Sequence, residues 1–283
     1  MIRQKIIKLK QSHIDEEKQL KIKQICINLL KEFVNVCNKY NLTYWIDGGT
    51  LLGAARNGKM IPWDDDIDVT MPREDYTRLL FLAKNIPNLF DSNYFFQTAN
   101  TDKYFEVHAK LRYNNSTALT PREYNGLHNR GMFLDIFPLD CVPESRNIQQ
   151  DIAGFVKTIG KYVGQKNLTQ IPSYYFGVLN TVLTDIHQQN LLSGYIANAA
   201  FWRYDNNLVV LKKKWYENST MLKFENIDVS VPYNIDEVLT SWYGKDWRIP
   251  KKVENCHHAY IDPFVNYVEY DKITKEEFEY LIK

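Results

Sequence analysis

The stretch IPWDDDIDV, from Ile61 to Val69, places four aspartates within five positions beside a proline, a tryptophan and apolar residues. Carboxylates this close repel one another, and burying one of them without a partner is costly. The stretch is therefore either a solvated turn or part of a site where a positive partner balances the charge.

The alternation of polar and apolar residues favours the second interpretation. On a strand, Asp66 and Asp68 point to one face, whereas Ile67 and Val69 point into the core. Two carboxylates on one face suit a hard divalent cation with oxygen ligands. Asp135, a lone carboxylate in the apolar stretch MFLDIF, could complete a magnesium site from a neighbouring strand. Taken singly, the aspartate run could be a solvated turn and Asp135 a hydrogen-bonded structural aspartate, but their shared apolar neighbours weaken both readings.

A glycine pair precedes the aspartate stretch. Gly48 and Gly49 follow a short expected strand, Thr43 to Ile46, and precede a helix start expected at Thr50. Glycines let the backbone approach a ligand closely, and a helix N-terminus offers free N–H groups to an anion. Alone the signal is weak, because glycine pairs are common in turns.

Apolar periodicity predicts a helix from Glu16 to Tyr40, followed by a mixed α/β half that extends to about Asp140. Beyond Cys141 a largely helical half is expected, with a helix over 147–189 and a late strand from Phe224 to Val231. The predicted division is an N-terminal helical segment (1–41), a catalytic core (42–145) and a mainly helical extension that completes the site (146–283). Within the core, expected strands cover NYFFQTA, YFEVHAKLRYNN and GMFLDIFPLD; the second exposes Glu106, His108, Lys110 and Arg112 on one side.

Composition excludes several classes of protein. The 283 residues carry 35 Lys and Arg against 34 Asp and Glu, so the overall charge gives no reason to expect a nucleic-acid partner. The four cysteines form no CxxC pair, which argues against a zinc cluster or a disulfide framework. Without a secretory pattern or a bilayer-length apolar run, a cytoplasmic location is expected. The basic segment around Arg3, Lys5, Lys8 and Lys10 could contact an anionic membrane surface.

The joint pattern of Gly-Gly, paired aspartates and a later lone aspartate resembles the nucleotidyltransferase superfamily fold. More specifically, WIDGGTLLGAARNGKMIPWDDDIDVTMPREDY resembles the signature of the LicD family of phosphorylcholine transferases, related to the fukutin proteins. AKLRYNNST, GMFLDIFPLD, FENIDVSVP and WYGKDWRIP extend the similarity along most of the chain. Here Arg56-Asn57 stands where many members have Arg-His.

The resemblance implies a nucleotidyltransferase-like mixed sheet with flanking helices. It also implies Mg²⁺-dependent transfer of phosphocholine from CDP-choline to a sugar hydroxyl of a teichoic acid or lipopolysaccharide type precursor, with release of CMP; Mn²⁺ is the alternative metal. Asp66, Asp68 and Asp135 are expected to hold the metal, with Asp64 as a further ligand or an indirect partner. Asp135 and Asp64 are equal candidates for the general base.

Further residues are expected around the donor. Gly48, Gly49 and Thr50, together with Arg56 and Lys110, are candidates to contact its diphosphate, and Asp47 a sugar or a backbone group. A choline group favours aromatic faces, but the sequence does not choose among Trp45, Trp63, Tyr113, Trp202, Trp242, Tyr243 and Trp247. The remaining alternatives are another CDP-alcohol or nucleotide-sugar donor, nucleotidyl transfer from an NTP, and a non-catalytic subunit of a glycan-assembly complex.

Overall fold

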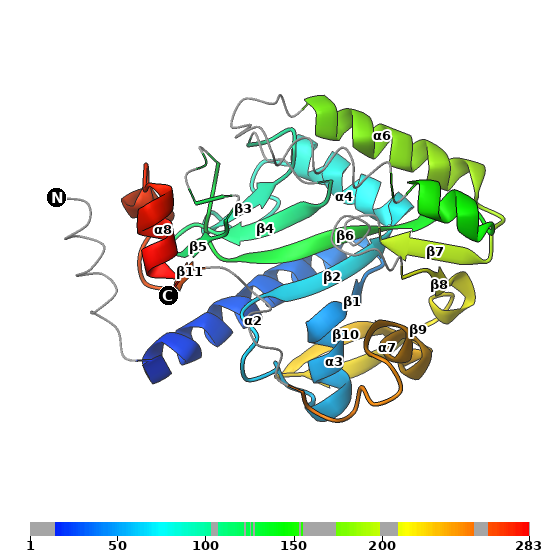
Figure 1. The fold of residues 1–283 in the computed structure, drawn as a ribbon, viewed down its shortest axis with the longest axis horizontal. Coiled ribbons are helices and arrows are strands. Elements are labelled where there is room, and N and C mark those ends of the chain that lie inside the picture. The colour runs from blue at the N-terminus through cyan, green and yellow to red at the C-terminus, as the bar shows by residue number, and fades with distance from the viewer. Residues whose placement is uncertain are drawn as a thin grey trace.

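A computed structural model describes residues 15–102, 107–121, 123–124, 126, 128–152, 154, 174–198, 209–251 and 260–282. Its centre is a mixed sheet in which β1, β2, β6, β4 and β3 lie in that order (Figure 1). Strands β2 and β6 are parallel, and their other neighbours pair antiparallel. The bounds are β1 Trp45–Ile46, β2 Ile67–Pro72, β3 Tyr94–Gln97, β4 Ala109–Tyr113 and β6 Phe133–Cys141. The expected mixed α/β fold is confirmed.

The longest strand, β6, also pairs with a strand from the later part of the chain. Near its end it joins β7 (Tyr195–Asn198), which in turn pairs with β8 (Leu211–Lys212). Part of the segment after residue 145 therefore extends the central sheet. That segment carries strands as well as helices where it is described, which the expectation of a mainly helical extension left out. The predicted division at residue 145 stays a prediction.

Helices pack on the sheet through apolar faces. Helix α2 (Asp15–Tyr40) contacts β4 and β6, and α4 (Arg73–Asn85) contacts β2 and β6. The helix predicted over 16–40 is confirmed, because Ile25, Leu29 and Phe33 are all buried as its periodicity requires. Further helices with described bounds are α3 Gly48–Asn57, α6 Tyr174–Gln189, α7 Ile235–Tyr243 and α8 Lys275–Leu281, with single-turn helices η2 Lys213–Trp215 and η3 Tyr267–Tyr270. Residues 146–152 are also helical. Residues 155–173 of the helix expected over 147–189 lie outside the described residues.

Two small sheets flank the central one. Strand β5 (Thr117–Leu119) pairs with β11 (Tyr260–Asp262) beside α8, and β9 (Ser219–Phe224) forms a hairpin with β10 (Ile227–Pro232). Helices α3 and α7 pack beside this hairpin and next to β1 (Figure 1). The late strand expected over 224–231 is confirmed as β10, but it begins at Ile227 because the chain reverses at Glu225 and Asn226. The preceding strand β9 was not expected. Lys23 and the backbone N–H of Met60 hold the Glu225 carboxylate in place.

A buried charged network supports β4. The Arg112 guanidinium donates to Glu123 Oε1 at 2.5 Å and to Gln97 Oε1 at 2.5 Å, and its side chain is fully buried. The predicted exposure of His108, Lys110 and Arg112 is therefore wrong, since all three are buried. Glu106 lies outside the described residues. Burial alone would raise the pKa of Glu123, but Arg112, helped by His128 and Lys110, holds it well below its ordinary value of 4.5.

This pair predicts a specific acid sensitivity. A lowered folded-state pKa gives stability that is present above the unfolded value and is lost as the pH falls through the folded one. We expect Glu123→Gln to lower the free energy of unfolding by about 3–5 kcal/mol at pH 7, because Arg112 is left buried without its charge partner. The difference from the wild type should shrink below pH 4.5. Urea unfolding between pH 3 and 7 measures it, with exposed Glu217→Gln as the control; a constant difference at every pH contradicts the assignment.

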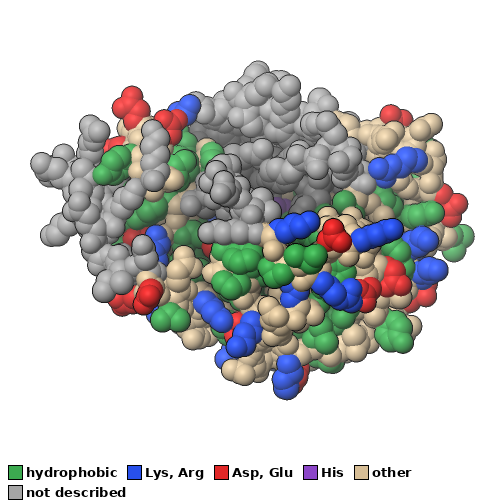
Figure 2. All heavy atoms as spheres, turned by 60° about the horizontal axis from the view of Figure 1, so that its bottom comes forward, with side chains coloured by type: hydrophobic (Ala, Val, Ile, Leu, Met, Phe, Trp, Pro, Cys, Tyr) green, Lys and Arg blue, Asp and Glu red, His purple; other side chains and the backbone are tan. Residues whose placement is uncertain are grey.

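Charged side chains of both signs are interspersed on the face shown in Figure 2, with hydrophobic side chains in small groups between them. The described part of this face carries no extended field of one sign. The expected absence of a nucleic-acid partner stays a prediction. Among the helices that the structure describes, none has the length and apolar character needed to cross a membrane. The basic residues before Ser12 lie outside the described part of the chain.

Candidate functional site

A row of polar side chains crosses the central sheet. The strand register pairs Asp68 of β2 with Asp135 of β6, Asp135 with Lys110 of β4, and Lys110 with Gln97 of β3. Paired residues on neighbouring strands share a face. The alternate position Val69 is buried in the core, as the alternation predicted. The sheet therefore brings the two carboxylates together although 66 residues separate them in the chain.

The third expected ligand lies beside them. Asp66 precedes β2, and one carboxylate oxygen from each of Asp66, Asp68 and Asp135 lies within 4.8 Å of the other two. A second such group consists of Asp64, Asp65 and Asp66. Oxygen ligands converging in this way fit a hard divalent cation such as Mg²⁺. The fit supports the predicted metal site, which stays a prediction.

The glycine pair is what allows the carboxylates to come so close. A Cβ atom on Gly48 would lie 2.5 Å from Asp68 Oδ2, and one on Gly49 would lie 2.6 Å from Asp64 Oδ2. Gly48 also has φ of 53°, in the left-handed region that favours glycine. The pair opens helix α3 at Gly48, two residues before the expected start. Glycine is needed here for the approach of the protein's own acidic side chains.

Asp47 and Thr50 fix the start of α3 against β2. Asp47 Oδ1 accepts a hydrogen bond from Gly48 N at 2.9 Å, so it holds a backbone group, one of its two predicted roles. Thr50 Oγ1 accepts from Asp68 N at 3.0 Å. Thr50 therefore positions the backbone of a metal-ligand candidate. Its predicted contact with the donor stays a prediction.

A methyl group at position 48 should disable the site at little cost in stability. In Gly48→Ala the Asp68 carboxylate must swing away, and a ligand misplaced by about 1 Å can cost about 100-fold in rate. The left-handed backbone adds only about 1–2 kcal/mol of strain. Transferase activity and thermal unfolding should be measured together. Gly194→Ala is the control, because nothing lies within 4 Å of its added Cβ atom; equal activity in the two variants contradicts the close approach.

Asp135 is held by two positive partners. Its Oδ1 atom lies 2.6 Å from Lys110 Nζ and 3.1 Å from His108 Nε2. Burial would raise the pKa of Asp135, but these two groups lower it to about 2. Lys110 Nζ contacts Asp135 and lies 3.4 Å from the centre of the Phe133 ring. The predicted contact of Lys110 with the donor phosphate stays a prediction. With Oδ1 taken up by these partners, Oδ2 is the atom left for a cation.

Asp68 has the opposite electrostatic environment. Burial raises its pKa well above the ordinary range, and the negative charges of Asp66, Asp135 and Asp64 raise it further. Burial also raises the pKa of Asp47 to about 6. These directions match the expectation that crowded carboxylates without metal resist ionisation. Asp135 is the exception, because Lys110 and His108 neutralise it within the fold.

A cavity of about 500 Å³ opens onto these carboxylates. Its walls come from the Gly48–Gly49 turn, the loop of residues 61–68 and the segment of residues 242–251. Asp64, Asp66 and Asp68 lie on one side, and the rings of Trp63, Trp242, Tyr243 and Trp247 also line it. The early and late parts of the chain thus line one cavity. That the extension completes the donor or acceptor site stays a prediction.

Arg56 lines this cavity but has partners of its own. Its guanidinium donates to the carbonyl oxygen of Trp247, through Nε at 2.7 Å, and to that of Ile249 at 3.0 Å. It therefore ties α3 to the far wall of the cavity. The predicted role of Arg56 as a phosphate contact stays a prediction, and the structure adds a positioning role that the sequence did not reveal.

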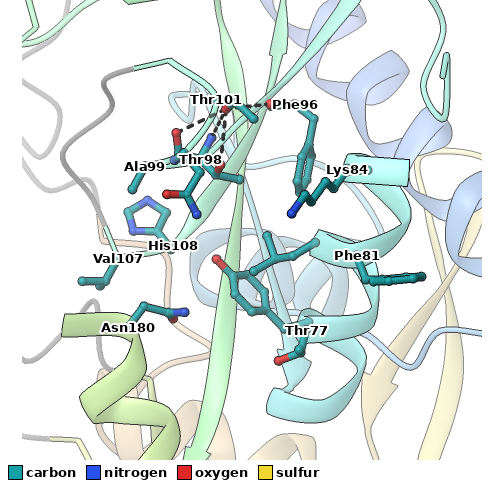
Figure 3. A pocket seen from close by; sticks show the side chains of 14 residues that line it. Thr77, Phe81, Lys84, Phe96, Thr98, Ala99, Thr101, Val107, His108 and Asn180 are labelled. Carbon is teal, nitrogen blue, oxygen red and sulfur yellow. Dashed lines mark hydrogen bonds between the residues drawn. The ribbon is translucent and has the colours of Figure 1, made fainter. Parts of the chain in front are cut away.

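A second cavity, of about 530 Å³, is lined by His108 (Figure 3). Val107 and His108, just before β4, line it together with Thr77, Phe81 and Lys84 of α4 and Asn180 of α6. His108 thus borders this cavity and also contacts Asp135. Two of the predicted aromatic candidates lie elsewhere in the core. Trp45 is buried and donates to Ser219 Oγ at 2.9 Å, and Tyr113 packs at the edge of β4, whereas Trp202 lies outside the described residues.

Residues 41–151 match the family described as LicD/FKTN/FKRP, nucleotidyltransferase domain. The chain therefore contains a LicD-family nucleotidyltransferase domain, which confirms the resemblance seen in its sequence. Lipopolysaccharide cholinephosphotransferase LicD of Haemophilus influenzae is 24% identical over 264 residues, covering 85% of this chain and 96% of that protein.

Other relatives match a shorter part of the chain. Ribitol 5-phosphate transferase FKRP of Homo sapiens is 44% identical over 54 residues, 18% of this chain and 11% of that protein. An uncharacterized protein of Rickettsia typhi, RT0683, is 42% identical over 67 residues, 24% of this chain and 20% of its own length. The domain and the two named transferases together indicate that this chain is a phosphotransferase.

Proposed function

We propose that the protein transfers phosphocholine from CDP-choline to a sugar hydroxyl of a cell-surface glycan precursor and releases CMP. The acceptor oxygen forms a bond to the phosphorus that carries choline, and the bond from this phosphorus to the bridging oxygen of the diphosphate breaks. The leaving oxygen stays with CMP, and the acceptor's proton passes to a base. The precursor is of the lipopolysaccharide or teichoic acid type and is lipid-linked at the inner face of the membrane.

The single observation that carries this proposal is the meeting of Asp66, Asp68 and Asp135 beside a cavity large enough for a nucleotide donor. A bound Mg²⁺ would neutralise charge that develops on the transferred phosphoryl group and orient the reacting oxygens. The three carboxylates would hold that ion. The glycine pair, which has no side chains, leaves room for the Asp68 and Asp64 carboxylates. Lys110 and His108 fix the Asp135 carboxylate.

The electrostatics also separate the two candidates for the general base. Asp135 has a pKa of about 2 and already accepts from Lys110 and His108, so it is a poor proton acceptor. Asp64, which lines the cavity beside Gly49, is the better candidate. A base works best when its pKa lies near the working pH, and the lowered pKa of Asp135 does not meet that condition. We therefore assign the role to Asp64, the other candidate.

The relatives support different parts of the proposal. The match along most of the Haemophilus influenzae protein favours choline phosphate as the group and a lipopolysaccharide-type glycan as the acceptor. The short match to the human ribitol 5-phosphate transferase keeps CDP-ribitol as an alternative donor.

Attachment to the inner face of the membrane would involve the basic residues before Ser12. Deleting the residues that precede Ser12 should then reduce co-sedimentation of the protein with anionic vesicles.

A donor panel tests the proposal directly. Purified protein with Mg²⁺ is mixed with CDP-choline, CDP-ethanolamine, CDP-ribitol, CDP-glycerol, CTP or ATP, and the thermal midpoint is recorded. A ligand that binds only the folded state raises the midpoint by mass action. We expect a shift with CDP-choline that disappears when EDTA removes the metal. A shift with CTP or ATP alone would favour nucleotidyl transfer, and no shift with any donor would favour a non-catalytic subunit.

A further inference from the structure

We propose that Trp63, Trp242 and Tyr243 form a cage for a quaternary ammonium group, so that this cavity selects a choline donor over a neutral polyol donor. The inference rests on the proposed function and assigns the part of the donor that the carboxylates do not contact. Three aromatic side chains from two distant segments line the same cavity as Asp64, Asp66 and Asp68. All three rings were among the aromatic candidates in the sequence, which did not choose among them.

Two of these rings, Trp242 and Tyr243, lie at the end of α7. Val238 and Leu239 bury one face of that helix in the core, which leaves Trp242 and Tyr243 in its last turn beside the cavity. Gly244 then ends the helix with φ of 81°, and the chain returns through a turn in which Trp247 N donates to Gly244 O. Arg56 holds the returned segment through the Trp247 carbonyl.

Trp247 itself is a less suitable cage member. Its side chain is buried in the core, and the Arg248 guanidinium lies 4.2 Å from the centre of its ring. This contact already takes up one face of that ring with a cation. Trp63 and Trp242 are partly exposed and Tyr243 is 44% exposed, as rings must be if a ligand is to reach their faces.

The charges around the cavity also favour a cation. Four carboxylates line it, because Asp246 joins Asp64, Asp66 and Asp68, whereas the lining cations are Arg56 and Lys251. Arg56 is directed at backbone carbonyls. A metal ion would balance the three carboxylates of the 64–68 loop and leave Asp246 beside the rings. A polyol needs several hydrogen-bonding partners, whereas ring faces and one carboxylate suit a trimethylammonium group.

The rings share their cavity with the carboxylates that would hold the metal. Tyr243, Asp66 and Asp68 all line it. Burial and the negative charges of Asp68 and Asp47 also raise the pKa of the Tyr243 hydroxyl. Choline is joined to its phosphate through two carbons, so the head group must bind close to the metal. Tyr243 is well placed to line both halves of that ligand.

The test compares donors with the nucleotide alone. Titration calorimetry with Mg²⁺ measures CDP-choline, CDP-ribitol and CMP on the full chain, for the wild type, Trp242→Leu, Tyr243→Leu and the aromatic replacements Trp242→Phe and Tyr243→Phe. We expect each leucine substitution to lower the affinity for CDP-choline by about 10-fold, because a cation–π contact contributes on the order of a tenfold change in binding. The affinity for CMP should stay within about two-fold of the wild-type value. The phenylalanine variants should retain most of the affinity.

Matched controls separate folding from binding. Tyr233→Leu removes a tyrosine that is 67% exposed and does not line the cavity, and it should bind like the wild type. Trp242 packs partly against the core, so thermal unfolding of its leucine variant must be checked; Tyr243→Leu is the variant with less risk to folding. Asp246→Asn should lower the affinity for CDP-choline and leave the affinity for CDP-ribitol unchanged.

Two results would overturn the cage. If CMP and CDP-choline weaken equally in the leucine variants, the rings stack on cytosine instead. If the wild type binds CDP-ribitol as tightly as CDP-choline, the rings do not select the head group. Failure of the proposed function looks different, since no CDP donor would then bind the wild type. In that case free choline, titrated while tryptophan fluorescence is followed, decides the cage: a change that Trp242→Leu abolishes supports it, and no change rejects it.

Discussion

Asp68→Asn should reduce phosphocholine transfer at least about 1,000-fold, because a metal ligand contributes several kcal/mol to stabilising the transition state. One carboxylate oxygen of Asp68 lies within 4.8 Å of an oxygen of Asp66 and of Asp135. Gly48 lies so close that a Cβ atom on it would be 2.5 Å from Asp68 Oδ2. An amide in its place loses the negative charge that a divalent cation requires. Release of CMP from CDP-choline in the presence of an acceptor glycan is the measurement.

The same variant should be more stable than the wild type when metal is absent. Burial and neighbouring carboxylates raise the folded-state pKa of Asp68 above its unfolded value, so keeping it ionised at pH 7 costs folding free energy. Removing the charge should return on the order of 1 kcal/mol, since one pKa unit corresponds to about 1.4 kcal/mol. Thermal unfolding in EDTA measures this gain. In Mg²⁺ the order should reverse, because only the wild type gains from the ion.

These two responses distinguish a metal ligand from a structural aspartate. A carboxylate that merely supports the fold would lower stability when replaced, with or without metal. Asp228→Asn provides the matched control, because Asp228 is an exposed carboxylate of β10 that pairs with Lys223. It should change neither activity nor the response to Mg²⁺. Full activity of Asp68→Asn would show that Asp68 is not an essential metal ligand.

The acidic residues could be recognised from the sequence because their evidence is local. Ile67 and Val69 alternate with carboxylates, and Asp135 lies between apolar residues. This local pattern alone predicted the strands and the positions that point into the core. The same holds for α2, whose apolar face continues for its full length. Their register was not readable. The pairing of Asp68 with Asp135 depends on β2 and β6 becoming neighbours, which is a property of the whole sheet.

The partners of the basic residues could not be predicted for the same reason. Lys110 and Arg56 were expected to contact phosphate because each is a cation near the right segment. The structure places Lys110 on Asp135 and directs Arg56 to carbonyls of residues 247–249, nearly 200 positions away. The sequence placed His108 on the same side of a strand as Lys110, two positions away. It did not predict that both side chains contact Asp135.

The hairpin of β9 and β10 shows a different limit. Its turn lies at Glu225 and Asn226, without the glycine that usually marks a two-residue hairpin turn. Glu225 has φ of 53° and is held there by contacts with Lys23 and the backbone of Met60. Distant residues thus stabilise a local conformation that its own sequence does not favour. The same hairpin packs beside α3 and α7, two helices whose residues line the cavity.

The second large effect concerns stability and the buried pair of Arg73 with Asp140. Arg73 opens α4 directly after β2, and its guanidinium donates to both oxygens of Asp140 on β6, each at 2.5 Å. It also donates to Asn180 Oδ1 at 2.8 Å, so one side chain joins α4, β6 and α6. Arg73→Met should lower the free energy of unfolding by about 3–5 kcal/mol, because Asp140 is then left buried without its partner.

A second pair on the same helix provides the control. Arg78 and Asp75 are also 2.5 Å apart, but the Arg78 side chain is 55% exposed. Arg78→Met should cost less than about 1 kcal/mol, because water screens exposed ion pairs. Urea unfolding of both variants at pH 7 measures the contrast. If burial is the cause, replacing both partners, as Arg73→Met with Asp140→Leu, should cost less than Arg73→Met alone, since no uncompensated charge remains. Equal costs for Arg73→Met and Arg78→Met, or a double variant that loses the sum of its single changes, would show that the pair stabilises through ordinary packing instead.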